Sequence, residues 1–525
     1  MQHEDGSDPT RAKSSGLLRS SLIVGMMTML SRVLGLVRDV VVANYFGASG
    51  SADAFFVAFK IPNFLRRLFA EGAFAQAFVP VLSEYRTQRD HDAVRRLVNR
   101  VAGTLGAVLL LVTVLAILAV KPLTALFAPG FYLEAQEKFE LASSMLAITF
   151  PYLMLISLTA FAGAILNSYE RFVVPAFTPV LLNVCLIGAA VGLSPYFAQP
   201  IVALAWGVLL AGAVQLLFQL PFLMRIKLLP VPIVDWNDEG VRRILKLMVP
   251  ALFGVSVAQI NLLLDTVLAS FLQTGSVSWL YYSDRLVELP LGVFAIAIST
   301  VILPSLSRKS AADSMQSFAR TLDWSLRMIL LIGFPSAIAL FMLAEPLLVT
   351  LFGYGNMTER DVYMAGASLR AYASGLLAFM LIKVLAPGYF SRQDMKTPVK
   401  IAVQAMLANM VFNLLLIGPL DHVGLALATA MSAFLNAGLL LRGLLQAGVL
   451  TWQPGWAAFA LRLSAACVAL VAIVVYLAVP LQQWFEWGVM QRVWQIALLV
   501  VCGVGGFGAT LLLSGLRKRH LKAPL

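Results

Sequence analysis

Residues 31–85 decide the fold, and they read SRVLGLVRDVVVANYFGASGSADAFFVAFKIPNFLRRLFAEGAFAQAFVPVLSEY. Most of this stretch is apolar enough for a lipid bilayer, yet it carries the charged residues Arg32, Arg38, Asp39, Asp53, Lys60, Arg66, Arg67 and Glu71. A charge at the centre of a membrane helix costs roughly 2.5–3.5 kcal/mol on insertion scales. A chain tolerates several where they face one another, a water-filled cavity or a polar ligand. The stretch therefore predicts two membrane spans that contribute to a functional site.

Helical geometry sorts the charges of the second span. At about 100° per residue, one face within about 40° holds four of them: Asp53, Lys60, Arg67 and Glu71. Arg66 points away from this face unless the helix is distorted, and Pro62 just before it permits a distortion. The charged face is the expected binding face.

On the first span, Arg32 and Asp39 are seven residues apart and share a face, whereas Arg38 points about 120° away. A purely structural alternative exists for part of the cluster. Arg67 and Glu71, four residues apart, could form an ion pair that only locks two helices together. The number of charges in the two spans favours a ligand site.

Composition sets the class of protein. The chain has 525 residues, of which 60% are hydrophobic and 13% charged, and its mean hydropathy is +0.84. Soluble proteins have about 25% charged residues. The longest polar segments are the first 18 residues and loops near 86–100, 225–247 and 308–322. We therefore expect an all-α polytopic membrane protein without a soluble domain and without a cleavable signal.

Several chemistries find no support in the sequence. Cys185, Cys467 and Cys502 lie in predicted spans, so neither a disulfide framework nor a metal site is expected. The four histidines lie at span ends or in the tails and are expected to be solvated: His3, His91, His422 and His520. No Gly-Lys dipeptide occurs, which excludes a P-loop ATP site. We expect no cofactor and no enzymatic activity.

Apolar runs of about 20 residues predict fourteen spans. They lie near 20–46, 52–85, 97–120, 139–167, 173–195, 199–224, 247–273, 277–306, 323–344, 362–390, 398–418, 422–447, 457–480 and 492–514.

Lysine and arginine orient these spans. One set of alternating connections and tails holds 25 of them, and the opposite set holds four: Lys121, Lys138, Arg360 and Arg492. The positive-inside rule places the first set and both termini in the cytoplasm. The net charge of +12 is therefore a topology signal and does not indicate nucleic-acid binding.

An internal repeat relates spans 1–6 to spans 7–12. KPLTALFAPG (121–130) returns as EPLLVTLFGYG (345–355), and DVVVA (39–43) returns as DTVLA (265–269). FVPVLS also returns as ILPSLS, 224 residues later, and NVCLIG returns as NLLLIG, 230 residues later. Because six spans separate the copies, both halves have the same orientation, which defines a parallel repeat.

The repeat predicts two six-helix lobes with a site between them, as in alternating-access transporters. The expected divisions are a tail (1–18), an N-lobe (19–226), a C-lobe (227–448) and a segment with spans 13 and 14 and a basic tail (449–525). The second lobe contributes its own intramembrane charges, Asp284, Arg285, Glu288 and, as a secondary candidate, Lys383.

Five segments resemble one known family. SRVLGLVRD (31–39), ADAFFVAFKIPNFLRRLFAEGAFAQAFVPVLSEY (52–85), GSVSWLYYSDRLVELP (275–290), KVLAPGYFSRQDMKTPVK (383–400) and QPGW (453–456) are similar to the MurJ (MviN) family of lipid II flippases. That family belongs to the multidrug/oligosaccharidyl-lipid/polysaccharide exporter superfamily. The similarity runs from about residue 17 to about residue 514.

The resemblance implies movement of undecaprenyl-pyrophosphate-linked disaccharide-pentapeptide to the outer leaflet of the bacterial cytoplasmic membrane. It implies that cavity arginines engage the pyrophosphate, and the family's key positions match Arg32, Arg38, Asp53, Arg66 and Arg285 here. It also implies that spans 13 and 14 line a groove for the lipid tail. Lipid II and membrane lipids are the expected partners, together with cell-wall synthesis proteins.

Charge arithmetic within the predicted site is balanced. Arginines and lysines are matched in number by Asp39, Asp53, Glu71, Asp265, Asp284 and Glu288. Asp53 and Asp265 lie near the outer ends of their spans, which would leave the deeper part positive. Arginine forks match phosphate oxygens bidentately, which favours a diphosphate ligand.

Two other functions remain open at this point. A cation-coupled multidrug exporter would need acidic residues dominating an aromatic cavity, whereas arginines recur in both halves. A membrane-embedded glycan transferase would need a catalytic or metal-binding carboxylate set in the outer loops, and no such cluster occurs there. Without an ATP site, directionality must come from the membrane potential, an ion gradient or consumption of the product.

Spans 13 and 14 follow the completed repeat. Their sequences are almost uniformly apolar and rich in glycine and alanine, which suits either close helix packing or a shallow groove. The groove hypothesis places Arg462 near its inner entrance and Gly503, Gly505 and Gly506 along it.

The topology is tested by cysteine labelling in intact cells. Gly50→Cys should react with a membrane-impermeant reagent added outside, and Asp90→Cys should react only from inside, because of the asymmetry in basic residues. The reverse pattern at either position would contradict fourteen spans with cytoplasmic termini.

Overall fold

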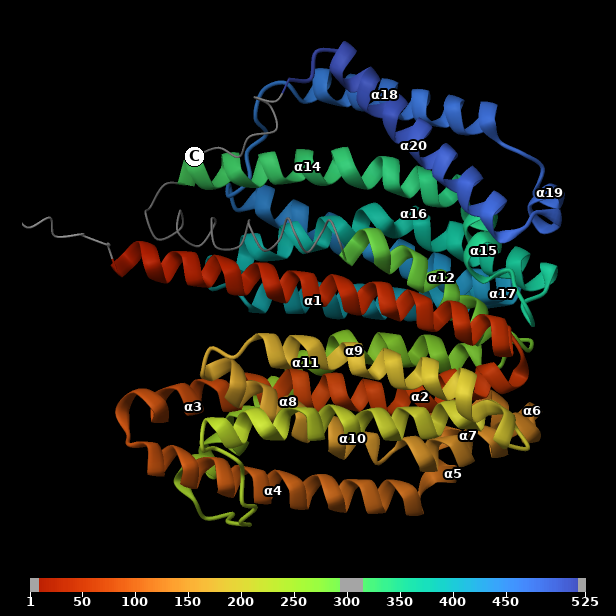
Figure 1. The fold of residues 1–525 in the computed structure, drawn as a ribbon. Helices are drawn as coiled ribbons and strands as arrows, with labels where there is room; N and C mark the ends of the chain where they lie inside the picture. Colours follow the sequence, from red (N-terminus) through yellow and green to blue (C-terminus); the bar gives the residue numbers. More distant parts are fainter. Residues whose placement is uncertain (1–8, 293–314, 518–525) are drawn as a thin grey trace, which may run out of the picture. The chain divides into compact units, whose positions relative to one another are not determined.

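The computed structural model describes residues 9–292 and 315–517, and these residues form helices and connections without a strand (Figure 1). The first half contains α1 (Pro9–Phe46), α2 (Gly50–Arg66), the π-helix η1 (Arg67–Phe74), α3 (Ala75–Gln88), α4 (His91–Leu118), α5 (Val120–Phe127), α6 (Pro129–Glu134), α7 (Gln136–Thr149), α8 (Tyr152–Ser168), α9 (Val173–Gly188) and α10 (Val202–Arg225). The second half contains α11 (Glu239–Ala269), α12 (Ser276–Pro290), α14 (Met315–Met342), α15 (Ala344–Phe352), α16 (Glu359–Phe390), α17 (Lys396–Gln446), α18 (Trp456–Leu477), α19 (Leu481–Glu486) and α20 (Val489–Leu513). The predicted all-α class is confirmed.

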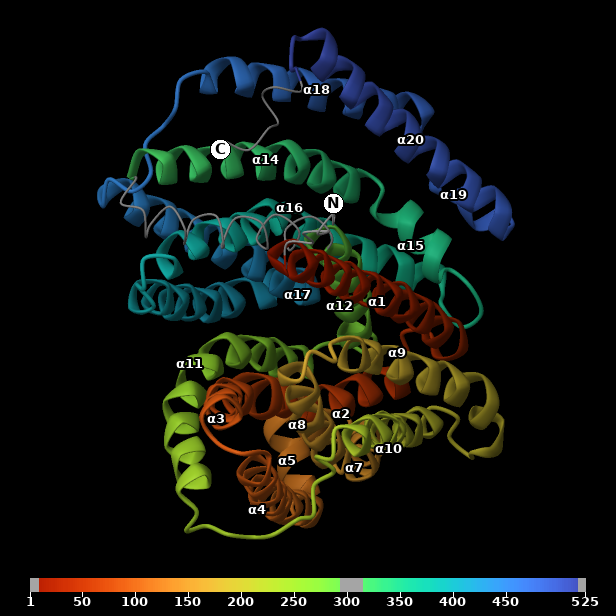
Figure 2. The same cartoon turned by 60° about the vertical axis from the view of Figure 1, so that its left-hand side comes forward.

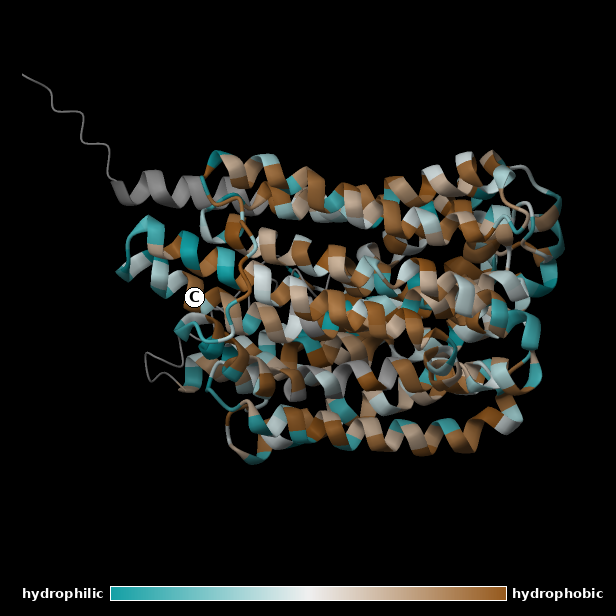
Figure 3. Cartoon of the chain, turned by 90° about the horizontal axis from the view of Figure 1, so that it is seen from below, coloured by the Kyte–Doolittle hydropathy of each residue, from teal (hydrophilic) through white to brown (hydrophobic). Residues whose placement is uncertain are grey.

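The helices fall where the fourteen spans were predicted. Among the described residues, nine helices are long and apolar enough to cross a membrane. One of them, α17, covers two predicted spans, because Asp421 leaves the helical conformation (φ 48°, ψ −131°) just after Pro419. The other four predicted spans fall on α1, on α2 to α3, on α11 and on α12. Figure 3 shows hydrophobic residues along the helices and hydrophilic residues gathered at their ends.

The rest of the predicted span 277–306, beyond residue 292, lies outside the described residues, and so does the ILPSLS copy of the repeat. The other repeated segments have the same backbone structure in both halves. KPLTALFAPG and EPLLVTLFGYG form the short helices α5 and α15. Glu170 and Gln393 occupy equivalent turns and share a left-handed φ of 61°. Next to the second turn, Asp394 accepts the Thr397 N–H at 3.0 Å, and this bond lowers the pKa of the Asp394 carboxyl.

The described chain forms two compact units, one of residues 1–45 and 50–259 and the other of residues 46–49 and 260–525. The division falls within α11 because the start of that helix packs in the first unit. Val241 and Ile244 are buried in the same apolar core as Phe78, Leu82 and Leu97. The predicted boundaries of the lobes, at 226/227 and 448/449, stay predictions.

The connection between α10 and α11 lies along α4. Asn99 holds it twice: its side-chain Oδ1 accepts the Val231 N–H at 2.9 Å and its backbone oxygen accepts the Ile233 N–H at 3.0 Å. One turn further, a Cβ atom on Gly103 would overlap the backbone of Ile233. Glycine is therefore required at position 103 for this close approach.

We expect Gly103→Ala to lower the thermal unfolding temperature of the protein in detergent, because overpacking a tight contact costs about 1–3 kcal/mol. The control is Gly106→Ala, three residues further along α4, where a Cβ atom meets open space. That variant should be neutral or more stable by up to about 1 kcal/mol, because alanine favours helix. An unchanged unfolding temperature for Gly103→Ala would show that the connection does not depend on this contact.

Candidate functional site

The charged pair of α1 is buried. Arg38 is 7% and Asp39 2% exposed. The Nε and Nη2 atoms of Arg38 donate to Asp39 Oδ1 at 2.9 and 2.7 Å, and Nη1 donates to Asn183 Oδ1 on α9 at 3.0 Å. Asn183 in turn donates to the backbone oxygen of Ser31 at 3.0 Å. A hydrogen-bonded pair of opposite charges, tied to a neutral amide, is how a membrane interior tolerates such groups.

The helical projection did not indicate this pair. It placed Arg32 and Asp39 on one face, whereas in the structure Asp39 is bound by the adjacent Arg38. Arg32 lies on α1 and is partly exposed. The pair thus joins spans 1 and 5 of the first unit.

The second span is distorted, although not at Pro62 itself. Helix α2 continues through Pro62 to Arg66, and the eight residues Arg67–Phe74 form a π-helix. Inserted π turns shift the faces of the residues that follow and occur frequently at functional sites. Arg66 and Arg67 lie at this junction, and Arg66 Nε donates to Asn63 Oδ1 at 3.2 Å.

The other charges of this span differ in exposure. Asp53 is 1% exposed near the start of α2. Lys60 is partly exposed and Arg67 is exposed. The side chain of Glu71 lies outside the part of the chain that the structure describes, so its predicted pairing with Arg67 stays a prediction.

In the second unit, three predicted residues lie together on α12. Arg285 Nη1 donates to Glu288 Oε2 at 2.8 Å, and Nη2 donates to the Tyr281 hydroxyl at 3.3 Å. The guanidinium also lies 4.9 Å from the centre of the Tyr281 ring. Unlike Arg38, the Arg285 side chain is 32% exposed, and Asp284 is exposed.

The two secondary candidates lie apart from this group. Lys383 is exposed on α16. Arg462 lies on α18 beside the turn that follows α20, with its Nη2 3.7 Å from the position of a Cβ atom on Gly515. The predicted convergence of Arg32, Arg38, Arg66 and Arg285 would join residues of the two units, and it stays a prediction.

The sequence interpretation counted Asp265 among the charges of the site but missed the polar cluster that it forms in the second unit. Asn413, which is fully buried, donates to Asp265 Oδ1 at 2.9 Å and to Asn409 Oδ1 at 2.7 Å. Thr429 donates to Asp265 Oδ2 at 3.3 Å. The cluster ties α11 to both halves of α17.

The signal for this cluster was present in the repeat. Asp265 and Asn413 begin the strings DTVLA and NLLLIG, and their counterparts Asp39 and Asn183 begin DVVVA and NVCLIG. Both halves therefore use an acid and an amide to join equivalent spans. The first half inserts Arg38 between them, whereas the second half has Leu264 at the corresponding position.

The prediction that His422 is solvated is wrong. The turn at Asp421 folds His422 inward, where it is 1% exposed. His422 Nε2 lies 3.0 Å from the backbone oxygen of Met364. Its ring packs 4.9 Å from that of Trp279, and Trp279 Nε1 donates to Asp361 at 2.8 Å.

Each unit, taken by itself, carries guanidinium groups and carboxylates within apolar helices. Within the described residues, no cluster of histidine, cysteine and carboxylate side chains could hold a metal ion. Arginines can bind a phosphate by two parallel hydrogen bonds, so the partly exposed arginines of each unit suit an anionic ligand.

Comparison with known proteins agrees with this chemistry. At 53% identity, the chain is similar to the probable lipid II flippase MurJ of Vibrio cholerae serotype O1, over 97% of this chain and 98% of the relative. It is equally similar, at 53%, to the probable lipid II flippase MurJ of Haemophilus influenzae, over 94% and 99% of the two chains.

Solved structures show the same fold. A lipid II flippase MurJ in an inward closed conformation matches with a TM-score of 0.79 and 26% identity, over 93% of this chain and 98% of that chain. An inward-facing multidrug resistance MATE family transporter of the MOP superfamily matches with a TM-score of 0.67 and 14% identity, over 83% and 99%. The family model described as lipid II flippase MurJ matches residues 42–498, and the chain therefore belongs to the MurJ family of lipid II flippases.

Proposed function

We propose that this protein flips lipid II across the bacterial cytoplasmic membrane by alternating access of its two lobes. The observation that carries the proposal is the high identity to lipid II flippases over nearly the whole chain. The intramembrane arginines support it independently, because a pyrophosphate headgroup needs cationic hydrogen-bond donors within an apolar protein.

The arginines differ in how readily they could meet the headgroup. Arg285 is held by Glu288 and Tyr281 but stays partly exposed, so a phosphate oxygen could compete for its donors. Arg32 and Arg66 are also partly exposed. Arg38 is buried against Asp39 and would reach a phosphate by exchanging one carboxylate contact. Electrostatic pairing in low dielectric is stronger than in water, which favours these exchanges.

The energy source and orientation complete the proposal. Both termini lie in the cytoplasm, as the distribution of basic residues indicates. A charge that crosses the membrane field gains about 2.3 kcal/mol per 100 mV, so the membrane potential is sufficient to bias closure of the lobes. The likeness to drug exporters, at 14% identity, concerns the fold alone.

Replacing Arg32, Arg38, Arg66 or Arg285 by alanine should abolish growth of cells that depend on this protein, because each loses donors to the pyrophosphate. Replacement of the same arginines by lysine should reduce growth without abolishing it, since lysine keeps the charge but loses the bidentate fork. Growth at native expression is measured, with protein level as a check and Arg96→Ala, at an exposed position on α4, as the control. Normal growth of all four alanine variants would contradict the headgroup site.

The three glycines of α20 differ in the space around them, so we expect their replacement to have different effects. A Cβ atom on Gly503 would lie 3.3 Å from Leu470 Cδ1 and one on Gly506 would overlap Ile473, so these two glycines allow α20 to approach α18. At Gly505 a Cβ atom meets open space. Bulky residues at 503 or 506 should therefore separate the two helices and lower stability.

Gly505→Leu should slow flipping of long-tailed lipid II in vesicles more than that of a short-tailed analogue, because it narrows the open face without disturbing the packing. Gly106→Leu, at another open position in a span, is the control and should affect neither analogue. If Gly505→Leu flipped the long-tailed lipid and the short-tailed analogue at equal rates, the groove hypothesis would lose its support, and the role of α18 and α20 would be helix packing.

A further inference from the structure

The rotation and depth of spans 13 and 14 in the membrane must be fixed by specific contacts. In lipid, apolar helices have little hydrophobic drive to adopt one particular arrangement, because lipid tails are as apolar as the side chains. Helices α18 and α20 expose large apolar residues such as Leu461 (74%) and Val501 (70%). They lie beside α14 in Figures 1 and 2. Polar contacts are the interactions that can fix their rotation and depth.

One polar clamp lies at the start of α18. Asp323 on α14 accepts the Trp456 Nε1–H at 2.7 Å and the Gln453 backbone N–H at 3.2 Å. Arg327 completes it with an ion pair to Asp323 at 2.9 Å and with hydrogen bonds to the backbone oxygens of Gln453 and Pro454. The QPGW motif thus joins span 13 to span 9.

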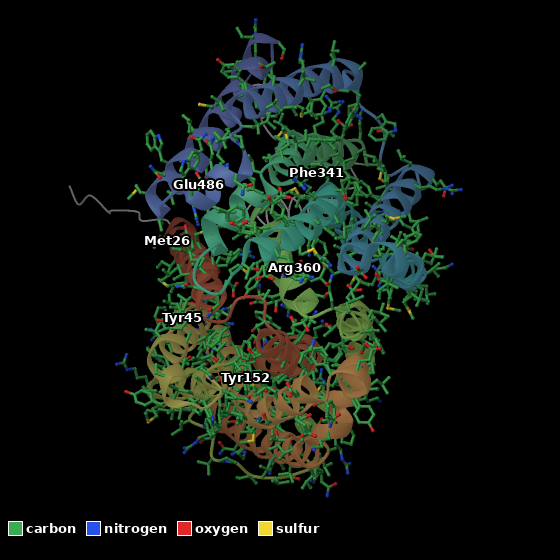
Figure 4. All side chains as sticks on the ribbon, turned by 90° about the vertical axis from the view of Figure 1, so that its right-hand side faces the viewer. Met26, Tyr45, Tyr152, Phe341, Arg360 and Glu486 are labelled. Atoms are coloured by element: carbon green, nitrogen blue, oxygen red, sulfur yellow. The ribbon has the colours of Figure 1, made fainter. Side chains whose placement is uncertain are left out.

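A second clamp lies at the start of α20. Arg492 is 6% exposed, and its Nη1 donates to the backbone oxygens of Val349 at 3.2 Å and Gly353 at 2.9 Å. Its Nη2 donates to the Phe485 oxygen at 3.1 Å, next to Glu486 on α19, which is labelled in Figure 4. The guanidinium lies 5.0 Å from the centre of the Tyr354 ring.

The charge balance of this clamp is unusual. In the described part of the chain, the Arg492 guanidinium meets carbonyl oxygens and a ring but no carboxylate, and its Nε has no hydrogen-bond partner. Its compensation comes from the carbonyl end of α15, where the helix dipole is negative. An apolar residue at this position would avoid the cost of burying a cation. Buried charges retained despite that cost are best attested as devices that fix register.

We propose that Arg492 is a positioning residue for the lipid tail: it fixes the rotation of α20, and of α18 packed against it, so that the face around Gly505, where a Cβ atom meets open space, receives the hydrocarbon. The proposal rests on the proposed function. Between the clamps, Phe459, Leu463 and Phe507 pack with Leu330 and Leu331 of α14. Such apolar contacts tolerate rotation, whereas three directed hydrogen bonds from Arg492 do not.

The test compares purified Arg492→Met and Arg492→Lys with wild type in vesicles that contain long-tailed or short-tailed lipid II. Arg492→Met should lose about tenfold in the flipping rate of the long-tailed lipid, as expected when hydrogen bonds to a charged group are removed. Flipping of the short-tailed analogue should fall less than about twofold on the same scale. Arg492→Lys should lie between, because one ammonium group cannot reach all three oxygens.

Arg360→Met is the matched control. Arg360 lies in the first turn of α16, is labelled in Figure 4 and donates to Gln273 Oε1 at 2.8 Å, so its loss removes a positive charge without touching the clamp. It should leave both rates unchanged. Asp323→Asn, at the other clamp, should repeat the selective loss for the long tail, and thermal unfolding identifies any variant that fails to fold.

Equal losses for the two analogues in folded Arg492→Lys would show a merely structural role and overturn the proposal. Wild-type rates for the long-tailed lipid in folded Arg492→Met would also overturn it. If wild-type protein itself flipped neither lipid, the proposed function would fall, and this proposal with it.

Discussion

The cost of placing charge in an apolar membrane interior is the constraint on which this structure depends. A charged group there needs a partner, a water-filled space or a ligand. In the first unit, the buried Arg38 meets this need by binding Asp39 and Asn183. The second unit keeps Arg285 partly exposed beside Glu288 and Tyr281. One arginine therefore organises helices, and the other remains accessible to an anion.

In both halves of the internal repeat, an acidic residue and an amide residue connect equivalent spans, but the two connections differ. An acid on the first span of each half and an amide on its fifth span are retained, as Asp39 with Asn183 and Asp265 with Asn413. In the first half an arginine connects them, and in the second half they bond directly. Spans 13 and 14 have no counterpart in the repeat. They are joined to the other helices of the second unit by polar clamps that the repeat does not supply.

The sequence predicted the fold well, because hydropathy and the repeat are properties of whole segments. It located the helices and divided residues 398–447 into two spans, and it noted that Pro62 permits the second span to be distorted. It failed where the structure depends on the contacts of a single side chain. A helical projection could not show that Arg38 pairs with the adjacent Asp39. Position at a span end could not show that the strained backbone of Asp421 turns His422 inward. Arg492 counted only as an exception to the charge rule, and its carbonyl partners come from residues far away in the chain.

Movement of lipid II to the outer leaflet by this protein can be tested by measuring outer-leaflet lipid II after rapid depletion of the protein. Lipid II would be detected in intact cells with a reagent that does not cross the membrane. Accessible lipid II should fall as the protein disappears, while total lipid II rises or stays constant. Unchanged accessibility in depleted cells, with no other flippase expressed, would contradict it.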